Sequence, residues 1–588
     1  ILSPQSSAIL RYKISIIFTF STMFKKILFQ IHWFLGITAG LILSIMGVTG
    51  AIYSYDQQIL KWVNSDSYVV QAENTPKLTP AQLYQHFNTT QPEIKINSIT
   101  IAKDPTSSSI VNIEKEGERR GYNMMVNPYN AEVLPDVKGR KLLLLIQQIH
   151  RNLTAGEVGK QITGACALML IYFVLSGLYL RWPKKHSARQ WLAVKPKLKG
   201  RNFIWDLHAV VGTWVIVFYL LFACTGLYWS YDWWRSGMFK VMGVEQPKRQ
   251  DHGATPQNQN RGIQQGKQSD RNNDKKSEPQ LDNTQLITAL NQTWSGFNSQ
   301  VGRDYSTLTL SLPKKDDGKI ELSFVDATPQ HERARNQAIY NYQTGNIEKI
   351  ELYENKKLNQ KIMSSMLPVH RGSFFGPIYQ FVAMLASLAM PLFLVTGWML
   401  YLKRRKQKKL TQAARQSLAG QYIDPNAKPW LITYATQTGV AEQLAWSTAT
   451  SLQEAHQPVQ VKPVQQLTQT DLEQHQQVLF VISTYGTGDA PDLATSFAKK
   501  LLKLNVDLKH INYAVLALGS KEYPDTYCSF GHAVDAWLKA NGAHALFNTI
   551  EVDNANPSDI QTWNQSLAKA TKLDLHAVNL EKVFDSWI

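Results

Sequence analysis

Four histidines recur at fixed distances from glycines and hydroxyl residues, and imidazole is a common protein ligand for a metal centre. His32 and His208 are each followed after 4 residues by a glycine and after 17 residues by a Thr-Gly pair. His150 and His370 each directly precede an arginine. Each is also followed after 6 residues by a glycine and after 26 by a hydroxyl residue with a glycine behind it. Such internal repetition indicates that one structural unit is used twice in the chain.

Four apolar segments must position these histidines. They cover residues 27–53, 162–180, 209–228 and 378–402, almost without charged side chains. Because about 20 residues of helix cross ~30 Å of hydrocarbon, the pattern predicts four transmembrane helices. His32 and His208 then lie at the start of the first and third spans, and the other two histidines precede the second and fourth.

The basic residues indicate how the spans are oriented. Residues 181–201 hold eight Lys and Arg and no acid, and six of the seven residues 403–409 are basic, whereas residues 56–141 hold ten of each sign. By the positive-inside rule, the N-terminus, the short middle loop and everything after residue 403 are predicted to be cytoplasmic. The two long loops are predicted to lie outside. Orientation and anionic lipid then explain the net charge of +17, so no nucleic-acid partner is expected.

This orientation places the histidines in two pairs at two depths, His32 with His208 on the inner side and His150 with His370 on the outer side. Two imidazoles that face each other across a helical bundle are the usual ligands of a six-coordinate haem. A lone histidine at an interface is more often an ordinary interfacial side chain, but four in register favour two haems. A metal site without a macrocycle is disfavoured, because no carboxylate or cysteine keeps the same register.

Other side chains that could do chemistry near the spans are few. Arg151 and Arg371 are candidates for pairing with haem propionates, and ordinary interfacial arginines are the alternative. The chain has only three cysteines, which excludes a disulfide scaffold and offers no thiolate cluster for zinc or iron–sulfur. No catalytic acid–base set is predicted.

The two long loops predict small α+β units. In the first loop, residues 79–87 are a helix candidate, residues 95–102 and 109–113 alternate like strands, and an Asn-Pro turn follows. The second loop has a similar ending within residues 339–350. Residues 246–282 are rich in Gln, Asn, Lys and Gly, so a disordered insertion is predicted there. A structural lid over the outer haem is the favoured interpretation of both loops.

The chain up to this point resembles the PepSY-associated transmembrane proteins, which include bacterial inner-membrane ferric-siderophore reductases. The resemblance covers about residues 26–403. It rests on the His-x3-Gly entries, the Thr-Gly exits, the His-Arg pairs, and the outer turns at Asn127-Pro128 and Thr344-Gly345. It implies a PepSY fold for both loops, two b-type haems on the four matching histidines, and reduction of iron complexes in the periplasm.

From residue 429 the composition is that of a soluble α/β domain. Buried strands are expected at residues 430–435, 478–483, 513–518 and 545–552, with helical patterns between them. This alternation indicates a doubly wound parallel sheet with helices on both faces, and such a sheet binds ligands at the carboxyl ends of its strands.

Three loops at these strand ends carry the candidate ligand-binding residues. The first offers hydroxyls and backbone N–H groups at a helix N-terminus, which suit a phosphate, and it lacks the lysine of a nucleotide-triphosphate loop. The other two combine aromatic side chains with glycines, which suit a planar ring. Loop by loop, the candidates are Thr436, Gln437, Thr438, Gly439, Val440 and Ala441; Thr484, Tyr485, Gly486, Thr487 and Gly488; and Leu518, Gly519, Tyr523, Tyr527, Cys528 and Phe530.

Residues 429–575 resemble the flavodoxin domain of diflavin reductases such as the sulfite reductase flavoprotein. The resemblance implies FMN, with its phosphate on residues 436–441, its isoalloxazine between Tyr485 and Tyr523, and its reactive edge at residues 486–488. Val440 departs from the Asn or Thr often found at its position, and Cys528 is interpreted as a packing residue. In diflavin enzymes an FAD/NADPH module follows, and none follows here, so a separate NAD(P)H-dependent reductase is expected as the electron donor.

The sequence thus predicts a multi-domain membrane protein with a four-helix bundle, two α+β PepSY-like loops and a C-terminal flavodoxin-like sheet. Its expected function is that of an oxidoreductase of the bacterial inner membrane, passing electrons from cytoplasmic FMN through two haems b to a periplasmic acceptor, most simply a ferric siderophore. The alternatives are an electron donor to a periplasmic redox protein, and a protease-binding or sensory membrane protein.

The domain boundaries follow from these segments. Met23 is the expected native start, within an N-terminal segment 1–26. The expected order is span 27–55, loop domain 56–149, span 150–182, basic loop 183–203, span 204–234, loop domain 235–366, span 367–403, linker 404–428, FMN domain 429–575 and tail 576–588.

Overall fold

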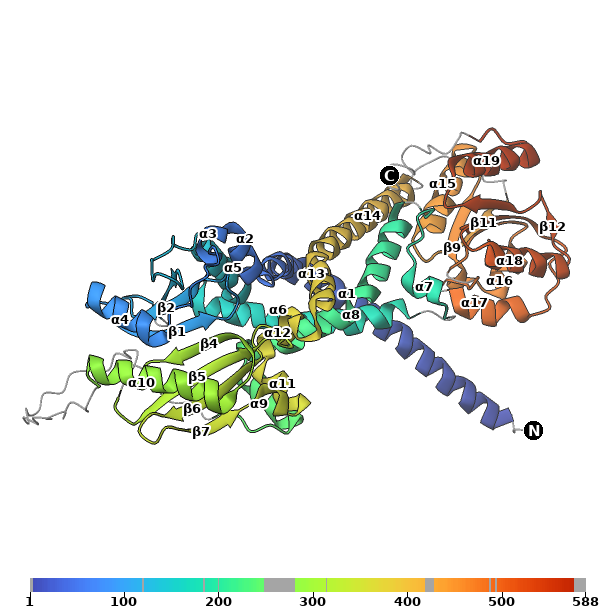
Figure 1. The fold of residues 1–588 in the computed structure, drawn as a ribbon. Helices are drawn as coiled ribbons and strands as arrows, with labels where there is room; N and C mark the ends of the chain where they lie inside the picture. The colour runs from blue at the N-terminus through green and yellow to red at the C-terminus, as the bar shows by residue number, and fades with distance from the viewer. Residues whose placement is uncertain are drawn as a thin grey trace, which may run out of the picture. The chain divides into compact units, whose positions relative to one another are not determined.

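The computed structural model describes residues 4–118, 121–182, 186–198, 200–247, 281–313, 315–417, 428–485, 488–491 and 494–575 (Figure 1). The chain forms two compact units that interleave along the sequence. The first unit comprises Ile1–Leu41, Ile171–Val217 and Pro391–Ile588, and the second comprises Ile42–Leu170 and Phe218–Met390. Each unit therefore contains part of all four predicted spans.

Four helices of the described chain are long and apolar enough to cross a membrane, as the sequence predicts. These stretches are Met23–Tyr53, Gly156–Arg181, Gly200–Ser230 and Pro377–Ala413. They lie in α1 (Pro4–Tyr53), α6 (Gly156–Arg181), α8 (Gly200–Ser230) and the successive helices α13 (Pro377–Leu388) and α14 (Met390–Ser417). The helices are longer than the apolar segments because polar residues also continue the backbone hydrogen bonding. The basic stretch after residue 403, expected to be a linker, is helical as far as Ser417.

The strands of the two long loops form one seven-stranded antiparallel sheet in the second unit (Figure 1). The first loop supplies β1 (Ile96–Ala102), β2 (Ser109–Ile113) and β3 (Tyr122–Val126). The second supplies β4 (Tyr305–Ser311), β5 (Lys319–Asp326), β6 (Arg335–Asn341) and β7 (Asn346–Glu351). The order is β3-β2-β1-β4-β5-β6-β7, so the pairing of β1 with β4 joins two loop units that the sequence suggests separately.

One helix from each loop packs against this sheet. The helix predicted at residues 79–87 is confirmed as α4 (Pro80–Thr90), and α10 (Asn283–Gly296) is its counterpart in the second loop. Both helices begin with capping boxes, on Thr79 and Asp282, which satisfy backbone N–H groups of the first turn. Leu83 of α4 and Leu290 of α10 are fully buried against the strands, which are apolar on the same face. Residues 248–280, most of the predicted insertion, lie outside the described residues.

Short helices connect the sheet with the spans. The helices α2 (Asp56–Val63), α3 (Ser65–Tyr68) and α9 (Asp232–Met242) follow spans, whereas α5 (Arg140–Asn152), α11 (Leu358–Ser364) and α12 (Met366–Arg371) precede them. Leu153 and Thr154, both with positive φ, end α5, and Gly372 with a φ of 90° ends α12. The histidines before the second and fourth spans therefore lie on helices of their own. This explains why the apolar part of the second span begins only at residue 162, twelve residues after His150.

The C-terminal part of the first unit is a doubly wound parallel sheet. Its strands are β8 (Trp430–Ala435), β9 (Val459–Pro463), β10 (Gln477–Ser483), β11 (Asn512–Gly519), β12 (His544–Ala545) and β13 (Ile550–Asp553). The order is β12-β11-β10-β8-β9, and β13 also pairs with β11. One core lies under α15 (Val440–Glu454) and α19 (Pro557–Thr571), and the other under α17 (Thr495–Lys499) and α18 (Ser529–Ala540).

Two differences from the predicted strands have physical causes. Strand β9 is not predicted, because at the sheet edge its side chains are only partly buried and its sequence lacks an apolar run. The single strand expected at residues 545–552 is two short strands, with Phe547 between them packing on the core instead of continuing the ladder.

Candidate functional site

In the second unit, His150 and His370 face each other. They lie near the ends of α5 and α12, and their ring centroids are 6.1 Å apart with an interplanar angle of 63°. A metal ion binds an imidazole nitrogen at about 2 Å, so two rings on opposite sides of one ion have centroids roughly 6 Å apart. The spacing of this pair therefore suits two ligands of one metal centre.

Both rings of this pair are held through Nδ1. The Nδ1 atom of His370 lies 2.7 Å from the hydroxyl of Thr225, which itself donates to the carbonyl of Leu221. The Nδ1 atom of His150 lies 2.9 Å from the carbonyl oxygen of Met46. Since these oxygens can only accept from the ring, Nδ1 carries the hydrogen and Nε2 keeps its lone pair.

In the first unit, the rings of His32 and His208 are also held through Nδ1. Nδ1 of His32 is 2.7 Å from the hydroxyl of Ser176, and Nδ1 of His208 is 2.7 Å from that of Thr396. Both hydroxyls donate to the carbonyl four residues earlier, at 2.6 and 2.7 Å, so both rings are again protonated at Nδ1.

The bonded hydroxyls are the ones that recur in the sequence. Ser176, Thr225 and Thr396 each hold the histidine of another helix, and Thr49 lies 3.4 Å from Nδ1 of His150. The sequence shows these residues at constant intervals, but their role was not predicted. The signal was available, because a hydroxyl kept in register with a histidine is a candidate for its hydrogen-bond partner.

Of the four glycines that follow these hydroxyls, one lies too close to a histidine ring to carry a side chain. A Cβ atom on Gly50 would lie 2.8 Å from Cε1 of His150, which is too close for a real contact. A Cβ atom on Gly226 would lie 3.5 Å from Cε1 of His370, and one on Gly177 would lie 3.6 Å from Cε1 of His32, which are ordinary contacts. Gly50 is therefore the glycine whose lack of a side chain the second-unit pair requires.

Of the two arginines beside these histidines, one is buried and one is exposed. Nη1 of Arg371 is 3.1 Å from Asp56 Oδ1 and 3.6 Å from Glu332 Oε1, and only 5% of the Arg371 side chain is exposed. Within the described part of the chain, its Nε and Nη2 atoms are buried without a hydrogen-bond partner. These two atoms form the edge of a guanidinium that can bind a carboxylate through two hydrogen bonds. Arg151 is exposed.

In the first unit, the three predicted loops follow β8, β10 and β11, which are neighbours in the sheet. The second and third loops are bonded together: Thr484 N–H donates to the Leu518 carbonyl at 2.8 Å, and the Ser529 hydroxyl donates to the Gly488 carbonyl at 2.9 Å. The structure therefore brings the predicted loops to the same edge of the sheet.

The first loop has the form of an anion site. Gly439, with a φ of 92°, precedes α15, and its N–H donates to the Thr436 hydroxyl at 2.8 Å. The side chains of residues 436–439 are partly exposed, whereas Val440 and Ala441 are buried in the core. Hydroxyls and backbone N–H groups at a helix N-terminus are a donor set that fits a phosphate. Only the backbone of Val440 and Ala441 can take part.

The candidates in the other two loops divide by exposure. The rings of Tyr485, Tyr523 and Tyr527 are exposed or half-buried, whereas Leu518, Cys528 and Phe530 are buried core residues. Burial raises the pKa of the Cys528 thiol to about 12, and its Sγ donates to the Ala517 carbonyl, as expected for a packing residue. Gly486 and Thr487 lie outside the described residues.

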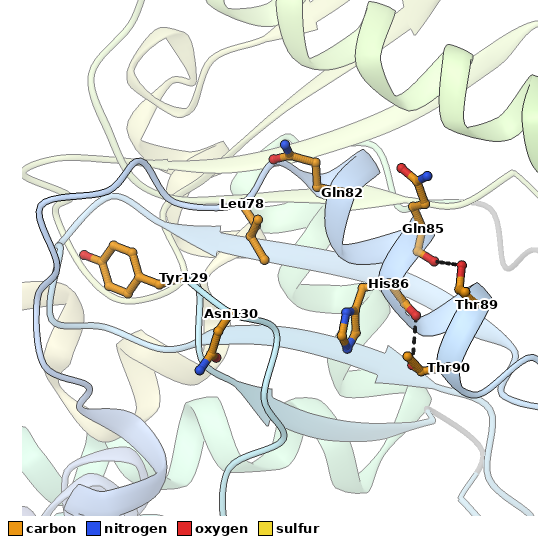
Figure 2. A pocket seen from close by; sticks show the side chains of 8 residues that line it. All are labelled: Leu78, Gln82, Gln85, His86, Thr89, Thr90, Tyr129 and Asn130. Atoms are coloured by element: carbon orange, nitrogen blue, oxygen red, sulfur yellow. Dashed lines mark hydrogen bonds between the residues drawn. The ribbon is translucent and has the colours of Figure 1, made fainter.

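A shallow pocket of about 450 Å³ lies on the second unit, away from the candidate ligands (Figure 2). It is lined by residues of α4, of the segment before it and of the turn after β3: Leu78, Gln82, Gln85, His86, Thr89, Thr90, Tyr129 and Asn130. The hydroxyls of Thr89 and Thr90 donate to carbonyls of their own helix, so toward a ligand they could act only as acceptors. No group of three or more His, Cys, Asp or Glu side chains that could hold a metal ion occurs in the described residues.

Comparison with known proteins divides the chain into the same N-terminal and C-terminal parts as the sequence analysis. Residues 29–404 match the family model of the PepSY-associated TM region, and residues 432–563 match that of flavodoxin. The C-terminal part is 34% identical over 167 residues to an inducible nitric oxide synthase of Gallus gallus, covering 26% of this chain and 14% of that protein. It is 32% identical over 149 residues to a sulfite reductase [NADPH] flavoprotein alpha-component of a Shewanella species, covering 25% and 24%.

Among solved structures, a flavodoxin of Streptococcus pneumonia is 25% identical, with 24% of this chain and 98% of that chain covered and a TM-score of 0.23. The match covers only 14% to 35% of the length of the curated relatives. The flavodoxin match supports FMN as the cofactor of the C-terminal domain and an oxidoreductase as the class of protein. The chain is a membrane protein of the PepSY-associated TM family that carries a C-terminal flavodoxin domain.

Proposed function

We propose that the protein is a membrane flavocytochrome that transfers electrons from FMN, through two b-type haems, to an acceptor on the opposite side of the membrane. One haem is assigned to His32 and His208, and the other to His150 and His370. FMN supplies the chemistry of accepting two electrons and releasing them singly, which suits a one-electron centre such as haem. The acceptor assigned is ferric iron in a chelate such as a siderophore.

The observation that carries the proposal is the hydrogen bonding of the four imidazoles. Two of them lie in each unit, and each ring donates Nδ1–H to an oxygen of a neighbouring helix. A ring held in this way presents the lone pair of Nε2, and metal-binding histidines almost always have such an outer partner. Since two imidazoles alone are too few ligands for a bare ion, a macrocycle that supplies four more nitrogens fits best.

The surroundings of His370 also fit a haem. Arg371 has a buried, unpaired edge that matches a carboxylate, and a haem propionate is a carboxylate. We assign Arg371 to a propionate of the second-unit haem. Arg151, which is exposed, is the weaker candidate for the same role.

The flavin would be held by the three loops at the carboxyl edge of the parallel sheet. Residues 436–441 supply donors for the phosphate, and Tyr485 and Tyr523 supply rings that can pack on the isoalloxazine. The basic residues at 181–201 and 403–409 support a cytoplasmic position for this domain and an inner-membrane location. A separate NAD(P)H-dependent reductase is then the expected donor.

An optical spectrum of the detergent-purified protein, oxidised and reduced, with pyridine haemochrome quantitation, tests the proposal. We expect two haems b per chain, falling toward one in His208→Ala or His370→Ala. His544→Ala, which removes an exposed histidine of the FMN domain, is the matched control and should keep both. Absence of a Soret band in protein that binds FMN would refute the haem assignment. It would favour the alternative of a protease-binding or sensory membrane protein.

The acceptor needs a separate assay, because a redox partner protein is the second candidate. Stopped-flow oxidation of the reduced protein by a ferric siderophore should be fast enough to compete with reoxidation by air. Slow oxidation by every ferric chelate tried, together with fast oxidation by a periplasmic extract, would favour the partner protein.

A further inference from the structure

The loop between α6 and α8 and the first turn of α8 contact the C-terminal domain within the first unit. Nη1 of Arg201, in the first turn of α8, donates to the carbonyl of Thr438 at 3.0 Å, in the loop assigned to the FMN phosphate. Nζ of Lys195 lies 5.5 Å from the centroid of the Tyr523 ring, in the loop assigned to the isoalloxazine. Six residues before Lys195, α7 (Ala188–Leu192) places Arg189 3.8 Å from Glu522, the neighbour of Tyr523.

The charge of Arg201 is not explained by the helix that carries it. A cation in the first turn of a helix opposes the helix dipole, so this arginine does not stabilise α8. A cation bonded to a loop of backbone donors at a helix N-terminus suits an anion held by the same loop.

The loop is built to hold its position. The backbone N–H and Nζ of Lys195 both bind the carboxylate of Asp206 in α8, at 2.9 and 3.1 Å, and both side chains are buried. At the other end, Arg181 of α6 donates to the carbonyls of Gln190 and Trp191, at 2.7 and 3.0 Å. The loop that carries Lys195 is therefore held in place by its own hydrogen bonds to α6 and α8.

We propose that the membrane part of the chain completes the FMN site, with Arg201 binding the FMN phosphate and Lys195 covering the Tyr523 side of the ring. This inference rests on the proposed function, because it requires FMN in the three loops. A phosphate at residues 436–439 carries about two negative charges. Arg201, bonded to the same loop, supplies the cation that the loop itself lacks. FMN would then hold the flavodoxin domain against the spans.

The test is flavin binding by the full-length, flavin-depleted protein in detergent, followed by fluorescence quenching. A charge-assisted hydrogen bond stabilises a complex by roughly 1.5–3 kcal/mol, so Arg201→Gln should bind FMN about ten- to a hundredfold more weakly. Riboflavin lacks the phosphate, and its affinity should be the same in wild type and variant. Increasing salt should weaken FMN binding in wild type and have little effect in Arg201→Gln.

Two further variants serve as controls. Lys197→Gln removes an exposed cation of the same loop and should bind FMN like wild type. Arg201→Lys keeps the charge without the planar fork and should lose only part of the affinity. Unchanged riboflavin binding in Arg201→Gln also shows that the domain is folded.

The other outcomes distinguish failure of this inference from failure of the proposed function. Equal FMN affinity and equal salt dependence in wild type and Arg201→Gln would overturn the inference while leaving the proposed function intact. Equal loss of FMN and riboflavin binding would also overturn it, since the phosphate would not be what Arg201 recognises. Failure of wild type to bind either flavin would refute the proposed function itself.

Discussion

The hydroxyl of Ser176 and Nδ1 of His32 lie 2.7 Å apart, although they belong to different spanning helices. Because the hydroxyl proton is donated to the Tyr172 carbonyl, the ring has to donate its own hydrogen to Ser176. The same relationship joins Thr225 to His370 and Thr396 to His208. These hydroxyls orient the imidazoles and fix which nitrogen carries the proton.

Loss of one of these hydroxyls should change the potential of the proposed haem without removing it. In Thr225→Val the ring loses an acceptor for Nδ1–H, becomes a weaker base and stabilises ferric iron less. We expect the midpoint potential to rise by roughly tens of mV, since a neutral hydrogen bond is worth about 1 kcal/mol and 59 mV corresponds to about 1.4 kcal/mol for one electron. A redox titration followed optically measures it. Thr225→Ser should restore the wild-type value, and identical potentials in all three proteins would contradict the assigned role.

Gly50 and Gly226 provide a matched pair of substitutions. Gly50→Ala places a methyl group 2.8 Å from Cε1 of His150, so the ring must move, whereas Gly226→Ala makes an ordinary contact of 3.5 Å with His370. Both glycines lie within helices, where alanine is the better helix former. Haemochrome quantitation should show a loss of haem from Gly50→Ala and close to full occupancy in Gly226→Ala. Equal occupancy in the two variants would show that the ring of His150 adapts.

The ion pair of Arg371 with Asp56 should contribute strongly to stability. The exposed fractions of the two side chains are 5% and 12%, so Arg371→Ala leaves a carboxylate buried without its partner, at a cost of about 3–5 kcal/mol in the free energy of unfolding. The pair of Arg303 with Glu354, whose carboxylate is 55% exposed, is the control. Arg303→Ala should cost at most about 1 kcal/mol. Thermal unfolding in detergent compares the two, and similar losses would show that burial does not determine the effect.

Cys528 should be unreactive in the folded protein. Burial raises the pKa of its thiol from 9.0 to about 12, so almost no thiolate is present at neutral pH. Because the folded pKa is above the unfolded one, this residue stabilises the domain below pH 9, and its contribution is lost as pH rises toward 12. Maleimide should label the denatured protein and not the native one at this position. In Cys528→Ala the extra loss of stability between pH 9 and 12 should be absent.

The sequence predicted the parts of this protein that depend on local pattern. The four spans follow from apolar length, and three of the strands in the flavodoxin domain follow from continuous apolar runs. Val459–Pro463 was missed because an edge strand is only partly buried and leaves no such run. The joining of β1 to β4 could not be read from the chain, since each strand carries the same alternating pattern whichever neighbour it has.

The candidate sites also have a part that local sequence patterns predict and a part that depends on packing. The four histidines and the three loops were found by type and spacing, because a ligand needs those residues whatever the fold. The contacts of Arg201 and Arg371 depend on which helices are neighbours, and that information is in the packing. Asp56 recurs in the sequence as the end of a Ser-Tyr-Asp motif, yet its arginine partner is more than 300 residues away.

The seven-stranded sheet cannot be completed until late in the synthesis of the chain. Strand β1 ends at Ala102 and its partner β4 begins at Tyr305, so two spans have to enter the membrane between the synthesis of one edge and the arrival of the other. Until then β1 presents an unpaired row of backbone groups, which is the kind of edge that recruits other chains. A nascent chain truncated after the second span should therefore need a holding chaperone or dimerise through β1, while the complete chain closes the edge itself.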